Sequence, residues 1–561
     1  MQKLIECVPN FSEGRNPVVI KQITDAIESV DGVKLLNVDP GKATNRTVVT
    51  FVGTPEAVIE AAFRGIQTAS TLIDMSNHSG EHPRMGATDV CPLIPISGIS
   101  MEETAAYAVQ LAERVGKELQ IPVYLYEEAQ TNKSRSNLSV IRSGEYEGFF
   151  DKIALPEWKP DFGPAQMNAQ SGATVIGARD FLIAYNVNLN TKSTRIANRI
   201  AFDIREAGRV KREGNPISGK VVKDANGEDV RIPGKLKFVK AIGWYIEEYG
   251  IAQISINLTN FRHTPLHQVF EETCKSADER GARVTGSELV GLVPLQPMID
   301  AGKYFLEKQG LSSGVDESTL IDIAIKSMGL NELSEFDPKT RIIEYLLKDL
   351  QSERLVNLSV KSFANETASD SPAPGGGSIA ALSAALGASL GTMVANLSAS
   401  KRGWEERVSE FSPWAVQGQK LKDELLHLVD EDTRAFDAIL AAFGLPKDTE
   451  EQKNLRKLAI EKASQYATEI PYKTMLKAYE CLPLMREMSK KGNPNSLSDV
   501  GVGVICLKTA VRGAWFNVIT NAKGLTDREF AENIVSKAEA LLRKNHAECD
   551  EIANDIESRL R

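Results

Sequence analysis

The stretch KLLNVDPGKATNRTVVTFV, residues 34–52, decides the fold of the first part of the chain. Residues 34–39 and 46–52 are rich in apolar and β-branched side chains and are typical of strands. Pro40-Gly41 marks a turn directly after the first of them. We therefore expect two neighbouring strands of one sheet.

Helical and extended segments alternate on either side of these strands. The apolar spacing predicts the order β-α-β-β-α-β, the ferredoxin-like arrangement, and then repeats it. The first set comprises strands 4–8, 34–39, 46–52 and 89–96 with helices 18–30 and 55–73, extended by a helix at 101–119 and a strand at 122–126. The second set comprises strands 181–190, 236–242 and 252–258 with helices 193–206 and 265–280. We predict two α/β subdomains, residues 1–180 and 181–330, which face each other across a ligand cleft.

The last third of the sequence has a different pattern. Phe336-Asp337-Pro338 interrupts the chain, and residues 331–355 are predicted to be a linker. Residues 356–561 show helical spacing almost throughout and predict an all-α helical-bundle domain. The predicted helices are 379–395, 405–443, 450–469, 472–490, 498–521 and 527–560, with Pro413 and Pro446 interrupting or ending them. Their apolar faces exceed what a small bundle can bury, so we expect a homo-oligomer with helix-mediated dimer contacts.

Composition limits the classes of function. A formal net charge of −9 argues against nucleic acid as the main partner. The six cysteines form no Cys-x-x-Cys pair, so neither a zinc site nor a disulfide framework is indicated. We find no apolar run approaching the ~20 residues of a membrane span and no signal peptide, and we expect a cytoplasmic protein.

The loop SGEHPRMGATDVCP, residues 79–92, has the composition of a functional site. It places His82, one of six histidines, between charged neighbours, and Pro83 and Gly86 restrict the backbone around it. A histidine held in this way can transfer protons near neutral pH. The alternative is an ordinary surface turn.

Two histidine pairs have the i, i+4 spacing of metal ligands on a helix. His78 and His82 lie in a stretch broken by glycine and proline, which argues against a helix and against a zinc site. His263 and His267 have a proline between them and are expected to be structural, with a role of one of them in the cleft as the alternative.

Asp432 is singled out by helical geometry. Along residues 421–443 the apolar stripe includes Leu425 and Leu428, and at about 100° per residue Asp432 falls inside this stripe. Asp430 points the opposite way. An aspartate on the buried side of a helix needs a partner, so Asp432 belongs either to a polar network or to a site.

A glycine-rich segment, PAPGGGS at residues 372–378, precedes the predicted helix 379–395. Free backbone N–H groups around Gly376 and Ser378 could bind an anionic part of a ligand. The alternative is a glycine turn with Ser378 as the N-cap, and both can hold together. The segment lacks the Gly-Lys-[Ser/Thr] ending of a P-loop, so no nucleotide is expected.

Three further polar residues lie on the predicted helix 498–521. Asp499 lies near its start, and Asn517 and Asn521 are spaced i and i+4 near its end. They are candidates for ligand binding, with capping or surface roles as the alternative.

Four segments carry a resemblance to a known family. CVPNFSEG at residues 7–14, the His82 loop, and GSELVG at residues 286–291 resemble glutamate formimidoyltransferases. The segment at residues 372–378 resembles cyclodeaminases and methenyltetrahydrofolate cyclohydrolases. The whole chain therefore resembles the bifunctional formimidoyltransferase-cyclodeaminase family.

The resemblance implies two successive reactions on a folate. The first transfers the formimino group of N-formimino-L-glutamate to N5 of tetrahydrofolate, and the second cyclises the product to 5,10-methenyltetrahydrofolate with release of ammonia, in histidine degradation. Polyglutamylated tetrahydrofolate is then the co-substrate, and neither a metal nor a nucleotide is expected. The alternatives are a C-terminal domain that acts mainly as a methenyltetrahydrofolate cyclohydrolase, and a non-catalytic folate-binding scaffold.

The resemblance also implies roles for single residues. His82 matches the catalytic histidine, which would take the proton from N5 and give one to the departing nitrogen. Asp432 matches the catalytic aspartate of the second reaction, which would accept the N10 proton and donate to the departing ammonia. Asp39 is our candidate for the carboxylate that orients the imidazole, with Asp89 as the alternative.

Residues 163–172 match the segment that lines the folate site in the family, although a plain linker would have a similar composition. These residues are Gly163, Pro164, Ala165, Gln166, Met167, Asn168, Ala169, Gln170, Ser171 and Gly172. A turn-rich excursion at residues 211–235 is longer than in animal members of the family, and it leaves the shape of one cleft edge open.

Overall fold

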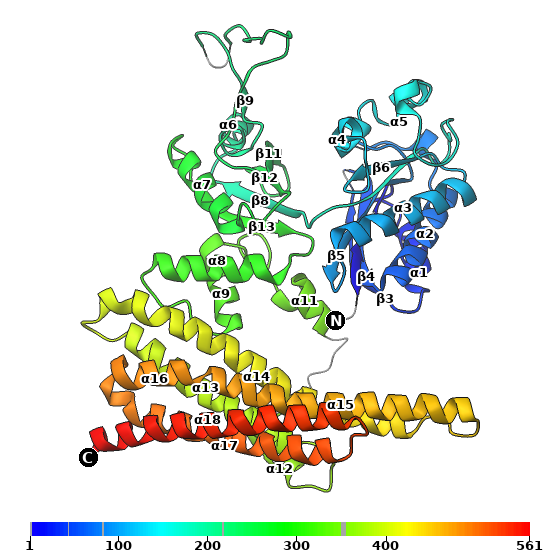
Figure 1. Cartoon of the computed structure of the whole chain (residues 1–561). Helices are drawn as coiled ribbons and strands as arrows, with labels where there is room; N and C mark the ends of the chain where they lie inside the picture. Colours follow the sequence, from blue (N-terminus) through cyan, green and yellow to red (C-terminus); the bar gives the residue numbers. More distant parts are fainter. Residues whose placement is uncertain (1–2, 43, 81–82, 216–217, 349–354) are drawn as a thin grey trace. The chain divides into compact units, whose positions relative to one another are not determined.

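The structure is a computed structural model that describes residues 3–42, 44–80, 83–215, 218–348 and 355–561. The chain forms two compact units, which are treated separately below. Unit 1 comprises Met1–Pro297 and Met328–Leu346, and unit 2 comprises Met298–Ser327 and Leu347–Arg561. Unit 1 contains the sheets and unit 2 is helical (Figure 1). This confirms the predicted α/β region followed by a mostly helical region.

The first sheet of unit 1, sheet A, has seven strands. They are β1 (Leu4–Cys7), β2 (Asn10–Phe11), β3 (Val33–Gly41), β4 (Arg46–Gly53), β5 (Thr88–Ser97), β6 (Val123–Glu127) and β7 (Thr174–Ala178). Their order is β1-β4-β2-β5-β7-β6, with β3 paired to β4. The predicted strands and helices up to residue 126 all occur, with ends within two residues of those expected. β2 and β7 were not predicted.

Three helices pack on one face of sheet A. They are α1 (Pro17–Glu28), α2 (Pro55–Leu72) and α3 (Met101–Glu118), and Figure 1 shows them beside β3, β4 and β5. The buried side chains of Ile5, Cys7 and Phe51 belong to the core that these helices cover. Two short helices, α4 (Leu138–Ile141) and α5 (Glu145–Lys152), lie between β6 and β7 in the sequence.

The second sheet of unit 1, sheet C, has four antiparallel strands. They are β8 (Ile183–Leu189), β11 (Val239–Ile246), β12 (Ile251–Leu258) and β13 (Val284–Val290), in the order β11-β12-β8-β13. Its helices are α6 (Thr194–Ile204) and α7 (Leu266–Asp278). The turn-rich excursion at residues 211–235 follows β9 (Arg209–Val210) and contains β10 (Arg231–Ile232). These two strands pair to form a two-stranded sheet.

The region around residue 330 is arranged differently from the expected subdomain and linker. Residues 298–327, expected in the second α/β subdomain, make their contacts within unit 2. They include most of α8 (Leu295–Lys308) and α9 (Glu317–Met328). Part of the expected linker instead forms α10 (Pro338–Arg341) and α11 (Ile343–Lys348). Asp337 accepts a hydrogen bond from Lys339 N at 3.0 Å, so Pro338 begins a capped helix rather than breaking the chain.

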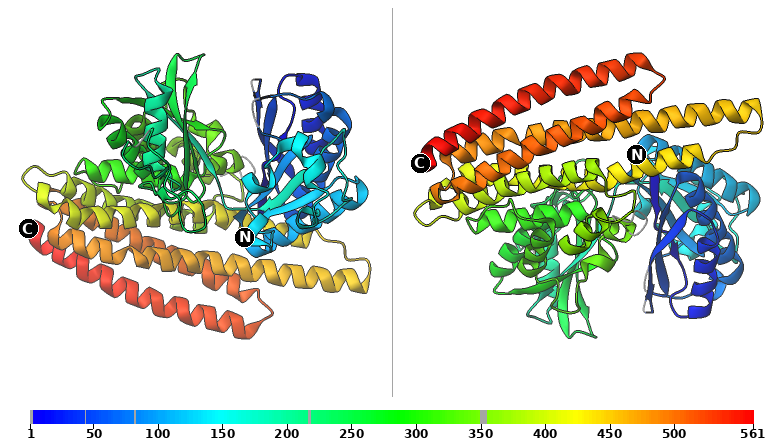
Figure 2. Two further views of the ribbon diagram at one scale, coloured as in Figure 1. Left: turned by 90° about the horizontal axis from the view of Figure 1, so that it is seen from above. Right: turned by 90° about the horizontal axis from the view of Figure 1, so that it is seen from below.

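Unit 2 is built from long helices that lie side by side in both views of Figure 2. The long helices are α13 (Gly376–Ala399), α14 (Val408–Phe443), α15 (Glu450–Glu480), α17 (Leu497–Lys523) and α18 (Arg528–Leu560), and α12 (Val360–Thr367) and α16 (Leu482–Lys491) are shorter. Helix α13 packs mainly against α14 and α17. Its buried residues are almost all alanine, glycine, serine or threonine, which lets the neighbouring helices approach closely.

Two expected helix interruptions were wrong. Pro413 lies inside α14, and the gap expected between the helices 450–469 and 472–490 is absent, because α15 runs through Pro471 to Glu480. A proline at position 471 cannot donate a backbone hydrogen bond to the carbonyl of Ala467. The side chain of Asn521 on α17 donates to that carbonyl instead, at 2.7 Å. A residue on a neighbouring helix thus stabilises a helix that the local sequence would end.

Two helices of unit 2 are long and apolar enough to match a membrane span by composition, which corrects the expectation that no run approaches this length. They are Gly376–Ala399 and Pro494–Lys523, with 61% and 39% of the most apolar window buried inside the protein. For α13 the small apolar residues serve the core of unit 2, as described above.

Candidate active sites

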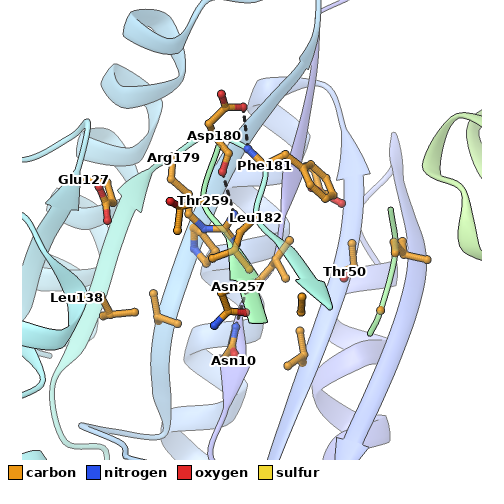
Figure 3. Close-up of a pocket in the computed structure, with 18 of the residues that line it drawn as sticks. Asn10, Thr50, Glu127, Leu138, Arg179, Asp180, Phe181, Leu182, Asn257 and Thr259 are labelled. Carbon is orange, nitrogen blue, oxygen red and sulfur yellow. Dashed lines mark hydrogen bonds between the residues drawn. The ribbon is translucent and has the colours of Figure 1, made fainter. Parts of the chain in front are cut away.

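A cavity of about 800 Å³ lies between the two sheets of unit 1, where the sequence predicted a cleft. Strands from both sheets supply its lining. Figure 3 shows Asn10 and Thr50 from sheet A together with Asn257 and Thr259 from β12 and its end. The connection between β7 and β8, residues 179–182, also lines it. The cavity is large enough for a ligand of the size of a substrate or cofactor.

Strand alternation places the lining residues of sheet A. Glu6, Val8 and Asn10 follow one another at every second position and line the cavity, whereas Ile5 and Cys7 face the helical core. On β4 the alternation selects Arg46, Val48 and Thr50 in the same way. A polar residue on the cavity face of these strands is therefore in a position to meet a ligand.

The cavity contains charges of both signs. Its cationic residues are Arg46, Arg142, Arg179 and Lys240, and its acidic residues are Glu6, Asp39, Glu127, Glu128 and Asp180. Burial lowers the pKa of Arg46 to about 10, so its guanidinium stays charged at neutral pH. A ligand that carries both carboxylates and hydrogen-bond donors would find partners for both.

Glu6 is the most buried of the acidic residues. Its side chain is 1% exposed, and burial raises its pKa to about 8. Neither carboxyl oxygen accepts a hydrogen bond from any residue in the described part of the chain. A buried carboxyl group without partners is costly, so it is a candidate for a ligand contact.

Replacing Glu6 by Gln is expected to stabilise unit 1 at pH 8 and to change its stability little at pH 5. Because the folded pKa of about 8 lies above the usual value of 4.5, the wild-type protein loses stability as the pH rises through this interval. At pH 8 the free energy of unfolding of the variant should exceed that of the wild type by on the order of a few kcal/mol. Thermal unfolding of both proteins at the two pH values measures it, and a variant that melts lower than wild type at pH 8 would contradict it.

His82 lies outside the described residues, so its catalytic role stays a prediction. The residues before it are fastened to the turn between β3 and β4. The side chain of Asn45 donates to the carbonyl of Ser79 at 3.0 Å, and His78 Nε2 lies 2.9 Å from the carbonyl oxygen of Asn45. This turn joins β4 to β3, the strand that carries Asp39, our candidate orienting carboxylate.

The residues after His82 are held by ion pairs. The guanidinium of Arg84 lies 3.1 Å from Glu145 and 2.6 Å from Glu147, and it also donates to the carbonyl of His78 at 3.2 Å. No group of three potential metal ligands occurs among the described residues. His78 is held in place by its contacts with Asn45 and Arg84.

The two candidate orienting carboxylates have different surroundings. Asp39 is exposed at the end of β3 and lines the cavity. Asp89 is fully buried and accepts hydrogen bonds from the backbone N–H of Met85 at 3.1 Å and from Arg142 at 2.6 Å. Burial raises the pKa of Asp89, and Arg142 opposes that shift. Asp89 thus anchors the loop, and Asp39 remains the better candidate.

Residues 163–172 do not line the cavity. The last residues of this segment pack against the end of the loop that carries His82. The backbone N–H of Ala87 donates to the carbonyl of Ser171 at 2.8 Å. Gly172 has φ of +71°, and a Cβ there would lie 2.3 Å from the carbonyl oxygen of Met85, so only glycine fits. The role of this segment in folate binding stays a prediction.

The remaining histidine pair lies by β11 and on α7. His263 packs edge-on against Phe238 with ring centroids 4.9 Å apart, and its Nδ1 lies 3.3 Å from Thr264 Oγ1. His267 lies in the first turn of α7. Neither residue lines the cavity.

A second candidate site lies in unit 2, where Asp432 on α14 meets the N-terminus of α13. Ser378 Oγ donates to Asp432 Oδ2 at 3.0 Å. A Cβ on Gly377 would lie 2.1 Å from Asp432 Oδ1, so a larger residue at position 377 would displace the Asp432 carboxyl group. The side-chain nitrogen of Asn517 lies 3.5 Å from the Cβ position of Gly376. Three residues predicted separately, Gly376, Ser378 and Asn517, are thus brought together around Asp432.

The environment of Asp432 suits proton transfer. Burial raises its pKa, and the hydrogen bonds from Ser378 oppose that shift. A carboxyl group with a raised pKa can accept a proton in one step and donate it in the next near neutral pH.

Asp430, predicted to point away from Asp432, is buried as well. It is 4% exposed and accepts hydrogen bonds from the backbone N–H groups of Leu355 at 2.7 Å and Val356 at 3.3 Å. The carboxylate therefore fastens the chain where α12 is about to begin. Helical spacing alone could not reveal this contact, because the segment that covers Asp430 is not part of a periodic element.

The other two candidates on α17, Asp499 and Asn521, do not join the site around Asp432. Asp499 lies 18 residues before Asn517, which corresponds to about 27 Å along an α-helix. The structure therefore does not bring Asp499 to Asp432. Asn521 is engaged with the carbonyl of Ala467, as described above.

Several cavity residues were not identified from the sequence. Glu6 had a visible signal, because a glutamate interrupts the apolar strand LIECV. Arg46 and Lys240 also alternate with apolar residues on their strands. Arg142 and Arg179 lie outside regular elements, so no periodic pattern marks them.

Comparison with known proteins covers nearly the whole chain. Three family models match: the N-terminal subdomain of the formiminotransferase domain at residues 4–179, the formiminotransferase domain at 184–348, and formiminotransferase-cyclodeaminase at 359–540. Formimidoyltransferase-cyclodeaminase of Mus musculus is 44% identical over 560 residues, 100% of both chains. Glutamate formimidoyltransferase of Thermoplasma acidophilum is 44% identical over 55% of this chain and 95% of its own. Methenyltetrahydrofolate cyclohydrolase of Methylorubrum extorquens is 36% identical over 36% of this chain and 98% of its own.

Proposed function

Because this chain belongs to the formimidoyltransferase-cyclodeaminase family, we propose that it carries out two successive reactions on tetrahydrofolate. Unit 1 transfers the formimino group of N-formimino-L-glutamate to N5 of tetrahydrofolate. Unit 2 cyclises 5-formimino-tetrahydrofolate to 5,10-methenyltetrahydrofolate and releases ammonia. These two reactions are steps in the degradation of histidine.

The mixed charge of the unit 1 cavity supports the transfer. N-formimino-L-glutamate carries two carboxylates and folate carries at least two more, and Arg46, Arg142, Arg179 and Lys240 supply cationic partners for them. N5 attacks the formimino carbon, N5 loses its proton, and the bond from that carbon to the glutamate nitrogen breaks. His82 takes the first proton and returns it to the departing amine, while Asp39 orients the imidazole.

The half-buried carboxyl group of Asp432, whose pKa burial raises, carries the proposal for unit 2. N10 attacks the formimino carbon of the intermediate, and the carbon–nitrogen bond to the former imino group breaks as ammonia leaves. Asp432 accepts the N10 proton and donates to the departing nitrogen. Gly376, Ser378 and Asn517 are placed to bind the folate beside it. Asp499 is no longer proposed for this site, since it lies too far along α17.

A second candidate for unit 2 is hydrolysis of methenyltetrahydrofolate. The Methylorubrum extorquens cyclohydrolase matches this region over almost its entire length, which favours that activity. A non-catalytic folate-binding scaffold is less well supported, because Asp432 has a raised pKa and keeps its serine partner.

Product analysis with the full chain tests the proposal. N-formimino-L-glutamate and tetrahydrofolate are supplied together, and glutamate, ammonia and the absorbance of methenyltetrahydrofolate are followed in time. We expect all three products. Consumption of supplied methenyltetrahydrofolate without ammonia release from 5-formimino-tetrahydrofolate would favour the cyclohydrolase. Folate binding without any product would favour the scaffold.

The two sheets of unit 1 are proposed to be ferredoxin-like. Support comes from sheet C, in which the element order β8-α6-β11-β12-α7-β13 is combined with the strand order β11-β12-β8-β13. In sheet A the strands β3, β4, β1 with β2, and β5 follow the same order, and β7 and β6 extend it.

A homo-oligomer with helix-mediated contacts is proposed as well. Exposed apolar side chains form a stripe on α13, with Leu386 at 53% exposure, and another on α17, with Ile505 at 58%. Because α13 and α17 pack against each other, the two stripes offer one face to a second copy. Sedimentation equilibrium of the wild type and of Ile505→Asp tests this, with a monomeric wild type as the contradicting result.

The polyglutamate tail and the cellular location remain proposals from the sequence. We propose that polyglutamylated folate is the physiological form, to be tested by comparing KM for folates with one and with several glutamates. A cytoplasmic location is proposed, to be tested by cell fractionation.

A further inference from the structure

Glu6 lies on the floor of the unit 1 cavity, and nothing in the proposed mechanism uses it. It follows Ile5 and precedes Cys7, which both face the core, so strand alternation directs its side chain toward the cavity. Both carboxyl oxygens are buried, and within the described residues neither has a hydrogen-bond partner. Nearly all buried polar groups in proteins are hydrogen-bonded, so a carboxyl group with two unused oxygens indicates a missing partner.

The charged and titratable groups around Glu6 do not supply that partner. Arg179, at the end of β7, lowers the pKa of Glu6 and Glu344 on α11 raises it. No residue in the part of the chain that the structure describes donates a hydrogen bond to the Glu6 carboxyl group. Tyr126 on β6 and Lys240 on β11 line the same cavity. The carboxyl group is therefore enclosed at the wall of the cavity, without a hydrogen-bond partner among the described residues.

The register of sheet A gives the distance from Glu6 to the catalytic end of the cavity. Glu6 pairs with Val52 on β4, whereas both Asn10 and Asp39 pair with Val48. Four residues along a strand correspond to about 13 Å. A bicyclic ring that contacts Glu6 at one edge fits into this interval with its other edge toward Asp39.

We propose that Glu6 binds the pteridine ring of tetrahydrofolate through the edge that presents N3–H and the 2-amino group. This inference rests on the proposed function and assigns it a specificity-determining residue. The two adjacent N–H donors match the two oxygens of a carboxylate, whereas the other end of folate presents carboxylates that Glu6 would repel. N5, the attacking atom, lies on the side of the ring away from the 2-amino group. The ring is thus oriented for the transfer.

An acceptor that lacks the 2-amino group tests the proposal in the wild-type full chain. Glutamate release is measured with tetrahydrofolate and with 2-desamino-2-methyl-tetrahydrofolate, so that only the unit 1 reaction is followed. We expect kcat/KM to fall about 10- to 100-fold with the second compound, mainly through KM. Equal kcat/KM for the two acceptors would overturn the inference.

Glu6→Gln supplies the matched variant, because glutamine keeps the shape of the side chain but presents an N–H₂ group to the 2-amino group. We expect a similar loss of kcat/KM with tetrahydrofolate, less than about threefold further loss with the analogue, and an unchanged KM for N-formimino-L-glutamate. Glu28→Gln, on the exposed end of α1, removes the same charge and should behave as wild type. A variant that keeps the wild-type discrimination, or that loses affinity only for N-formimino-L-glutamate, would overturn the assignment.

The pH dependence gives a readout that a purely structural role would not change. Glu6 in the empty cavity holds a proton up to about pH 8, and the ring binds the carboxylate, so binding releases a proton at lower pH. KM for tetrahydrofolate should fall as the pH rises from 6.5 to 8.5 in the wild type and stay flatter in Glu6→Gln. Identical pH profiles of the two proteins would overturn the inference. A wild type that releases no glutamate at all would instead contradict the proposed function.

Discussion

Replacing Asp432 by Asn should abolish ammonia release from 5-formimino-tetrahydrofolate and let this intermediate accumulate while transfer continues. Asparagine keeps the size of the side chain and its contact with Ser378, but it cannot take the N10 proton. General acid–base groups usually contribute about 10²- to 10⁴-fold to a rate. Ammonia and glutamate are measured in the same reaction, so that the two activities are followed separately. Normal ammonia release would place the catalytic group elsewhere.

Asp430→Asn is the matched control for this experiment. It lies two residues away on the same helix and is at least as buried, but its carboxylate binds the backbone N–H groups of residues 355 and 356. We expect a loss of stability of about 1–3 kcal/mol and near-normal ammonia release by the folded protein. If both variants lose ammonia release to the same extent while folded, burial rather than proton transfer would explain the effect at Asp432.

His82→Ala should abolish formimino transfer, whereas supplied 5-formimino-tetrahydrofolate should still be cyclised. The imidazole is expected to move two protons in the transfer, and the cyclising carboxyl group belongs to the other unit. The rate of glutamate release measures the first reaction and methenyltetrahydrofolate absorbance the second. Transfer at more than about a tenth of the wild-type rate would rule out His82 as the proton shuttle.

His78→Gln separates this role from that of the neighbouring histidine. His78 Nε2 lies 2.9 Å from the carbonyl oxygen of Asn45, and the amide of glutamine can donate a similar hydrogen bond. We expect transfer to be largely retained. A variant of His78 that is as inactive as His82→Ala would show that the placement of the loop, rather than the chemistry of one imidazole, had been disturbed.

The regular elements of sheet A were predictable because each has a strong local signal. Residues 34–52 contain two apolar strand runs around Pro40-Gly41, and β3 and β4 are found there. β2 is only two residues long and β7 follows a segment without periodicity, so neither stands out from its surroundings. The predicted break between the helices 450–469 and 472–490 is wrong for another reason. The effect of Pro471 depends on Asn521, which is 50 residues away in the sequence.

The same contrast holds for the candidate sites. Asp432 could be found because one helix face combines an apolar stripe with an acidic residue, and a helix period is a local property. Asp499 was misplaced because the spacing within α17 says nothing about which end of the helix meets Asp432. Glu6 was overlooked because alternation on a strand shows only that the strand has two faces. That one face of β1 borders a cavity depends on the position of sheet C, which the local sequence does not indicate.

The hydrogen bond from Asn521 to the carbonyl of Ala467 couples two positions that are distant in the sequence, 471 and 521. A chain that keeps Pro471 but changes Asn521 would retain a buried carbonyl without its donor, at a cost of about 1–3 kcal/mol. A chain that changes Pro471 while keeping Asn521 loses nothing comparable, because a carbonyl oxygen has two lone pairs and can accept both hydrogen bonds. Lineages of this protein that keep Pro471 are therefore expected to keep Asn521, and an engineer who grafts α15 into another bundle must carry part of α17 with it.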